Sequence, residues 1–146
     1  MSKRIFTRVY QGTVGATGTV LVEEPAKESW LLQEDIEVIG AEIALINQMP
    51  SENDGFAVVW AELSQTAIRG QDGAILVGQA YEGWNTTPAG VDVIAAHPIV
   101  SFPQGFAVPV KEEGYLYVNT AYLGKSAGVS IFSYEVIVYY TKKGSR

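Results

Sequence analysis

Apolar and polar residues alternate along much of this chain with the two-residue period of β-strands. Successive side chains of a strand point to opposite faces of a sheet, so a strand between a core and water alternates in this way. No segment shows the period of a long helix. The predicted strands, separated by turn residues, are Ile5 to Tyr10, Thr19 to Glu23, Asp35 to Asn47, Gly55 to Leu63, Ala74 to Tyr81 and Val91 to Ala96.

The last part of the chain, Gly114 to Thr141, predicts two longer strands joined by a polar loop. In the second of them the odd positions are polar only at Ser133 and Glu135, and the even positions are all apolar or aromatic. A strand that is apolar on both sides needs a cover on both sides. In so short a chain we expect a second subunit to provide one cover. The strand is also long enough to bend between two sheets.

Glycine and proline punctuate the other segments. The large apolar residues of 36–45 change parity beside Gly40, which predicts a β-bulge or a bend. Gln11 to Gly18 and Glu82 to Gly90 are rich in turn residues and predict loops. Three prolines between 98 and 109 predict an edge strand or a broken strand over Val100 to Val110.

These about eight or nine strands predict an all-β fold, a jelly-roll-like antiparallel β-sandwich. The 146 residues fit a single domain that spans 1–146. Within it, 1–8 form a possible N-terminal arm and 142–146 a frayed tail.

The composition narrows the class of partner. The net charge of -6 argues against nucleic acid and against an anionic membrane surface, because both need clustered Lys and Arg. No window has the length and apolarity of a membrane span, and the first residues lack the apolar run of a secretory signal. We therefore expect synthesis in the cytoplasm.

Candidate chemistry is sparse. The chain has no cysteine and one histidine, His97, so the usual zinc clusters and thiolate nucleophiles are excluded. The carboxylate pairs, such as Glu112-Glu113, are adjacent and would face opposite ways on a strand. No G-x-S-x-G nucleophile motif is present. We expect no enzymatic activity, no cofactor and no metal site.

Two alternatives remain for the aromatic residues. Trp84 lies in a predicted loop beside Tyr81 and Glu82, and together they would suit a carbohydrate-binding module. Aromatic residues are equally typical of cores and of interfaces between subunits, and we favour the second interpretation.

Two runs near the C-terminus resemble a known family. Ser101-Phe102-Pro103-Gln104-Gly105, followed by Glu113-Gly114-Tyr115-Leu116-Tyr117-Val118-Asn119 and a tyrosine-rich last strand, is similar to the C-terminal half of small virion proteins of tailed bacteriophages. These include jelly-roll capsid decoration, or cement, proteins and minor structural proteins. The resemblance implies a non-enzymatic homotrimer on the capsid surface of a virion, with the major capsid protein as its partner.

The sequence also supplies candidate contact residues. For the interface between copies we select the apolar and aromatic residues of the two last strands: Tyr115, Tyr117, Tyr134, Val136, Val138 and Tyr140. For contact with the capsid we select the basic residues of the predicted arm: Lys3, Arg4 and Arg8.

Overall fold

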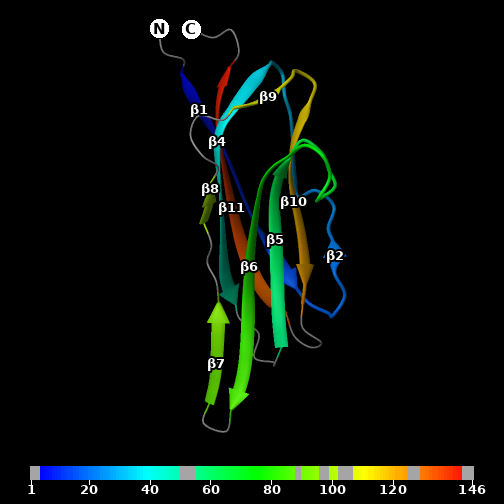
Figure 1. Ribbon diagram of the computed structural model, residues 1–146, viewed down its shortest axis with the longest axis vertical. Coiled ribbons are helices and arrows are strands. Elements are labelled where there is room, and N and C mark those ends of the chain that lie inside the picture. The colour runs from blue at the N-terminus through cyan, green and yellow to red at the C-terminus, as the bar shows by residue number, and fades with distance from the viewer. Residues whose placement is uncertain are drawn as a thin grey trace.

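All regular structure in the computed structural model is β-strand (Figure 1). It describes residues 4–49, 55–87, 90–95, 99–101, 107–124 and 129–142, and the side chains of 4–46, 57–81, 107–124 and 129–142. The strands are β1 (Ile5–Ala16), β2 (Val22–Glu23), β3 (Glu28–Leu31), β4 (Ile36–Met49), β5 (Gly55–Ser64), β6 (Ala74–Thr87), β7 (Gly90–Ala95), β8 (Ile99–Ser101), β9 (Val108–Val110), β10 (Tyr115–Leu123) and β11 (Ser130–Lys142). No helix among these residues is long and apolar enough to cross a membrane.

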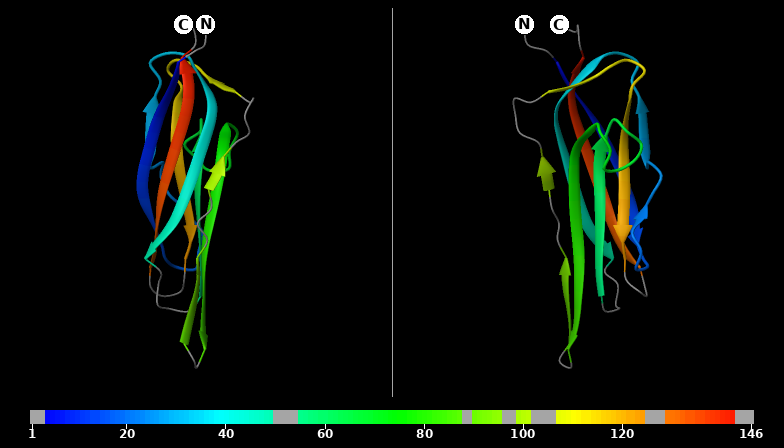
Figure 2. Two further views of the ribbon diagram at one scale, coloured as in Figure 1. Left: turned by 90° about the vertical axis from the view of Figure 1, so that its left-hand side faces the viewer. Right: turned by 45° about the vertical axis from the view of Figure 1, so that its right-hand side comes forward.

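The strands form two antiparallel sheets that pack face to face (Figure 2). One sheet has the order β1-β11-β4. The short strands β8 and β9 lie one after the other along the outer edge of β4. The other has the order β10-β5-β6-β7, with β2 and β3 along the free side of β10. If β2 with β3, and β8 with β9, each count as one interrupted strand, this is the jelly-roll order with β7 added as a hairpin partner of β6. The predicted fold class is confirmed.

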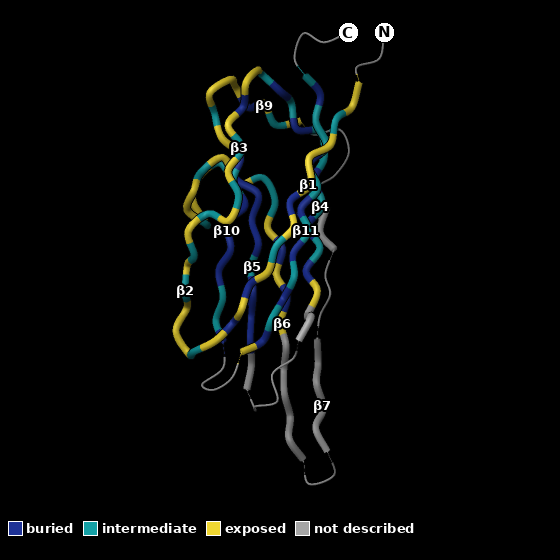
Figure 3. The backbone as a smooth tube through the Cα atoms, turned by 180° about the vertical axis from the view of Figure 1, so that it is seen from behind, coloured by how far each residue is buried: buried dark blue, intermediate teal, exposed yellow. Residues whose placement is uncertain are grey.

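The core lies between the two sheets (Figure 3). From Ser130 to Val138 the buried residues of β11 are at the even positions, and on β10 the buried residues include Leu116 and Val118. The sheets approach closely where Gly78 of β6 faces Ile43 of β4, since a Cβ at Gly78 would lie 2.9 Å from Ile43 Cγ2. The largest fully buried apolar side chains are Phe132, Leu32, Ile36, Ile43, Leu45, Leu63 and Leu116.

The predicted bulge beside Gly40 is confirmed. Tyr139 of β11 pairs with Gly40 and Tyr140 pairs with Val38, so Ile39 is an extra residue on β4. This single insertion moves Ile36 and Val38 to the same side of the sheet as the buried residues that follow Gly40.

Several boundaries differ from the prediction. The glycine-rich Gln11 to Gly18 is not a loop up to Ala16, because β1 continues to that residue and pairs with β11 without a break. The predicted loop of Glu82 to Gly90 is wrong in the same way, since β6 reaches Thr87 and β7 begins at Gly90. Cross-strand pairing supplies in both places the order that local sequence does not predict.

The long last strand does not bend between the sheets. β11 stays in one sheet from Ser130 to Lys142, between β1 and β4, with register shifts at two places along β4. The predicted N-terminal arm is shorter than 1–8, because Ile5 to Arg8 already belong to β1. Likewise Lys142, placed in the predicted tail, pairs with Ile36. Lys3 and residues 143–146 lie outside the described residues.

Candidate functional site

The outer surface of the β1-β11-β4 sheet is a mixture of apolar and polar side chains. Its residues follow from the pairing register, since partners across antiparallel strands share a face: Val9, Gln11, Thr13, Ala44, Ile46, Ser133, Glu135 and Ile137. We call this set the outer face. Val9 is 51% exposed and Ile46 is 45% exposed. These two large aliphatic side chains lie on β1 and β4, with β11 between them.

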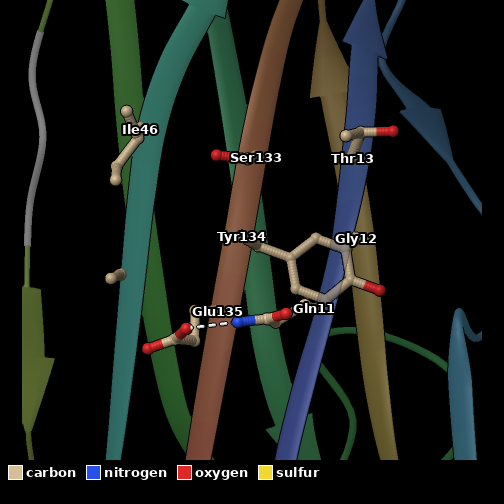
Figure 4. Close-up of a pocket in the computed structure, with 8 residues that line it drawn as sticks. Gln11, Gly12, Thr13, Ile46, Ser133, Tyr134 and Glu135 are labelled. Carbon is tan, nitrogen blue, oxygen red and sulfur yellow. Dashed lines mark hydrogen bonds between the residues drawn. The ribbon is translucent and has the colours of Figure 1, made fainter.

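A hollow of about 460 Å³ lies over the outer face, with Ile46 on one side and Gln11 and Thr13 on the other (Figure 4). It exists because the strands carry glycine and small side chains there. On one side of it, Gln11 Nε2 donates a hydrogen bond of 2.6 Å to Glu135 Oε2. The residues that line it are Gln11, Gly12, Thr13, Ala44, Ile46, Ser133, Tyr134 and Glu135.

Three of the predicted interface residues face the other way. Tyr134, Val136 and Val138 belong to the buried core of the single chain. Their selection as interface residues is therefore wrong, because reaching a partner would require the two sheets to separate. Between positions 131 and 140, the only residues that are neither apolar nor aromatic are Ser133 and Glu135. Both are on the odd face, and this weak signal already pointed to the even face as the core. The partly exposed face holds the odd positions, with Ile131 and Ile137 half-buried.

Tyr115 and Tyr117 lie on the outer side of the second sheet. Their rings stack with centroids 5.3 Å apart and planes inclined by 16°. Tyr115 is 39% exposed, and its cross-strand neighbour Leu31 is also exposed. These three residues form a second small apolar surface, on the opposite side of the sandwich from the hollow. Both tyrosines remain candidate contact residues.

The sixth candidate, Tyr140, belongs to a cluster of aromatic and basic side chains. Its ring stacks on Phe6, with centroids 5.6 Å apart, and packs against Trp30, with centroids 5.0 Å apart. The Arg8 guanidinium lies 4.6 Å from the centre of the Trp30 ring, and Arg4 lies 5.2 Å from that of Phe6. Such cation–π contacts stabilise the packing by about 0.5–1 kcal/mol each at exposed sites. The Arg8 side chain of β1 therefore packs on Trp30 of β3 and does not extend freely into solvent.

A cavity of about 250 Å³ adjoins this cluster. Lys142 lies at it and forms an ion pair with Glu34, with Nζ and Oε1 3.0 Å apart. Tyr140 and Arg8 both pack on Trp30, so this tryptophan does not offer an open ring for stacking against a sugar. The remaining lining residues are Leu32, Gln33 and Ile36.

A buried carboxylate escaped the sequence analysis. Glu62 is 1% exposed although it lies on the outer side of β5, because the loop 65–73 folds over it. Glu62 accepts hydrogen bonds from the Gly70 amide at 2.9 Å and from Asn119 Nδ2 at 3.1 Å. In the sequence, the one signal for this burial is that Glu62 lies on the same face of its strand as the apolar residues Val58 and Trp60. These contacts assign it to holding the loop.

The same loop is held by a second group of contacts. Arg69 donates hydrogen bonds to the carboxylate of Glu23, and these bonds raise the pKa of the Arg69 guanidinium. The same guanidinium lies 5.0 Å from the centre of the Trp60 ring. The loop ends in a turn at Asp72-Gly73, with Gly73 at a φ of 98°.

Three tyrosines among the described residues have a raised pKa. Burial raises the pKa of Tyr10 and that of Tyr134 to about 12. Burial, followed by the charge of Glu42 and a hydrogen bond to it, raises the pKa of Tyr139. No three His, Cys, Asp or Glu side chains in this part of the chain are grouped as metal ligands. His97 lies outside the described residues.

The alternative sugar site was predicted to lie in a loop, but its residues belong to a strand. Tyr81 is exposed on the outer side of β6. Glu82 and Trp84 also belong to β6, not to a loop, and their side chains lie outside the described part. The loop that suggested a carbohydrate platform is therefore absent at these positions.

Comparison with known proteins gives similarity only to solved structures. No protein-family model matches the chain. No curated protein sequence matches it either. A structure of the pili that form Bacillus endospore appendages is 17% identical, with a TM-score of 0.42, and the match covers 98% of this chain and 93% of that one.

Two structures from viruses are similar to the same degree. One is from the Gx strain of infectious bursal disease virus, at 14% identity and a TM-score of 0.39, covering 98% of this chain and a third (33%) of that one. The other is from the capsid asymmetric unit of cyanophage Pam1, at 16% identity and a TM-score of 0.36, covering 93% and 84%. At these sequence identities and TM-scores, none of the three structures indicates what this chain does.

Proposed function

We propose that this chain is a non-enzymatic structural protein of a virus particle that assembles as a homotrimer and attaches to the surface of the capsid. The observation that supports it best is the outer face, where Val9 and Ile46 are exposed and Ile46 lines a hollow. The likeness of residues 101–119 to small phage virion proteins supplies the viral context.

The chain offers two different contact surfaces, and a three-fold ring requires two. In a ring each copy uses one patch toward its left neighbour and another toward its right neighbour. In the proposed ring the outer face with Ile46 of one copy meets Tyr115 and Tyr117 of the next, and each contact also turns the next copy by a third of a full turn so that the ring closes. A stable interface buries on the order of 800 Å² on each partner, so both patches would have to contribute broadly.

Light scattering on the purified chain tests the assembly. We expect a mass three times the 15.8 kDa of one chain. Ile46→Asp places a charge in the contact and should convert the trimer into monomers. Ile68→Asp is the control for the outer face, because Ile68 is exposed on the loop 65–73 of the other sheet. A monomer at micromolar concentration for the unchanged chain would refute the proposal.

Attachment to the capsid is assigned to the basic residues at the start of β1. Arg4 is exposed there, and Lys3 precedes it. Deleting 1–8 would remove part of β1, so a point variant is the better test. Arg4→Glu should weaken co-sedimentation with shells of the major capsid protein, and more so at low salt. Lys111→Glu makes the same charge change at another exposed site. Equal binding by the two variants would contradict the assignment.

A further inference from the structure

β1 offers one long edge for backbone pairing. It pairs with β11 on one side along all of its 12 residues. Among the strands that the structure describes, none lies on its other side. Along an antiparallel strand, alternate residues direct both their amide and their carbonyl group to the same side. About half of the residues of β1 therefore direct these groups toward the open side.

This edge lacks the devices that usually keep edge strands apart. Natural edges are short, or carry Pro, Lys, inward charges or a bulge. β1 contains no Pro, and its register with β11 is unbroken from Ile5 to Ala16. Its one charged side chain, Arg8, lies over the Trp30 ring.

The other described edges are short by comparison. β2 has two residues, β3 has four, β8 and β9 have three each, and β7 has six. β9 also contains Pro109. None of them matches the length of β1. Among the described edge strands, therefore, only β1 of a second copy is long enough to pair with β1 along its full length.

We propose that β1 of one copy pairs antiparallel with β1 of a second copy across a two-fold axis, joining two β1-β11-β4 sheets into one continuous sheet. The axis is perpendicular to the sheet, so the outer face of one copy continues into that of the other. This contact is separate from the proposed trimer, which uses the faces of the sandwich and leaves the edge of β1 open.

The side chains of β1 are compatible with such a pairing. For the two outer faces to stay on one side, odd-numbered residues must pair with odd-numbered ones. Registers centred on Tyr10 or on Gln11 give the greatest overlap. Arg8 then lies opposite Gly12 or Val14 of the second copy, and Val9 lies opposite Gln11 or Thr13. No like charges meet, whereas a register centred on Arg8 would place two arginines side by side.

Residue-resolved hydrogen exchange tests the proposal, with the same chain measured when dilute and when concentrated. The amides of alternate β1 residues, those pointing away from β11, should exchange quickly in the dilute sample. They should exchange at least tenfold more slowly in the concentrated one. Ile46→Asp should keep this protection even if the trimer is lost, so failure of the trimer and failure of the edge pairing are distinguishable. Association with unchanged exchange along β1, or a chain that stays monomeric at millimolar concentration, would overturn the proposal.

Crosslinking provides an independent measurement. Because the chain has no native cysteine, an introduced cysteine is the only thiol that can react. Gln11 is exposed and lies at or next to the centre of both registers. Gln11→Cys, treated with a short thiol-reactive crosslinker, should give a dimer in at least tenfold higher yield than Ile68→Cys, whose site is equally accessible. Equal yields from the two variants would argue against β1 pairing.

Discussion

The ring of Tyr134 lies against the backbone of Gly12, its partner across β1 and β11. A Cβ at position 12 would come within 2.6 Å of Tyr134 Cζ. The absence of a side chain at Gly12 is thus what allows a buried tyrosine to lie flat beside the neighbouring strand. A glycine that looks like a loop signal in sequence is, in the sheet, a packing requirement.

Gly12→Ala should destabilise the fold by about 1–3 kcal/mol, the usual cost of overpacking. The free energy of unfolding in urea measures it. Gly15→Ala is the matched control on the same strand, since its Cβ would meet Val129 Cγ1 at an ordinary 3.4 Å. If the loss comes from the tyrosine, Gly12→Ala combined with Tyr134→Ala should cost less than the sum of the two single changes. Additive effects would contradict the packing explanation.

Glu62→Ala should lower the free energy of unfolding by about 1–3 kcal/mol, because Asn119 would be left buried without its carboxylate partner. Loop 65–73 should also become more sensitive to proteolysis, since the Gly70 amide loses its acceptor. Glu23→Ala removes only a partly exposed ion pair with Arg69 and should cost less than about 1 kcal/mol. A larger loss for Glu23→Ala than for Glu62→Ala would reverse this ranking.

The protein should lose stability in strongly alkaline solution. Burial raises the pKa of Tyr10 and Tyr134 to about 12, above the ordinary tyrosine value of 10.0. The folded state therefore favours the protonated phenols. Their contribution is fully present below pH 10 and is lost as the pH rises toward 12.

Urea titrations at several pH values between 8 and 12 measure this loss. Tyr10→Phe combined with Tyr134→Phe removes both phenols and should flatten the decline. If the double variant loses as much stability over this range as the unchanged chain, other groups are responsible.

Tyr115→Asp tests the second contact patch without disturbing the core. Tyr115 is exposed and lies outside the core, so the monomer should lose only the stacking on Tyr117, about 0.5–1.5 kcal/mol of the free energy of unfolding. The fraction of trimer measured by light scattering should fall. Val20→Asp gives the same charge at an exposed apolar site on a different part of the chain. An equal fall for both variants would remove Tyr115 from the interface.

Much of the fold could be predicted from local patterns. The change of parity beside Gly40 predicted a bulge, and the extra residue Ile39 is found there. Turn residues placed the end of β5 and the start of β6, and the prolines of 98–109 predicted the short edge strands β8 and β9. These features depend on neighbours in sequence, which is why one sequence is enough to predict them.

The candidate surfaces could be predicted only in part, because they depend on contacts distant in sequence. The odd face of β11 is polar only at Ser133 and Glu135, so the local signal against Tyr134, Val136 and Val138 as interface residues was weak. Trp30 lies beside Arg8 only because β3 and β1 meet at one side of the sandwich. Glu62 looks like a solvent-facing strand residue until loop 65–73 covers it.

The pairing of the first strand with the last has a mechanical consequence. Ile5 lies opposite Thr141, so the outer ends of β1 and β11 are at the same end of the molecule (Figure 1). Tension applied between the two chain ends would peel β1 from β11 one residue pair after another and would never load the twelve pairs in shear. The domain should therefore yield at low force when pulled by its ends. A particle that relies on it for strength would have to transmit load through the surfaces of the sandwich.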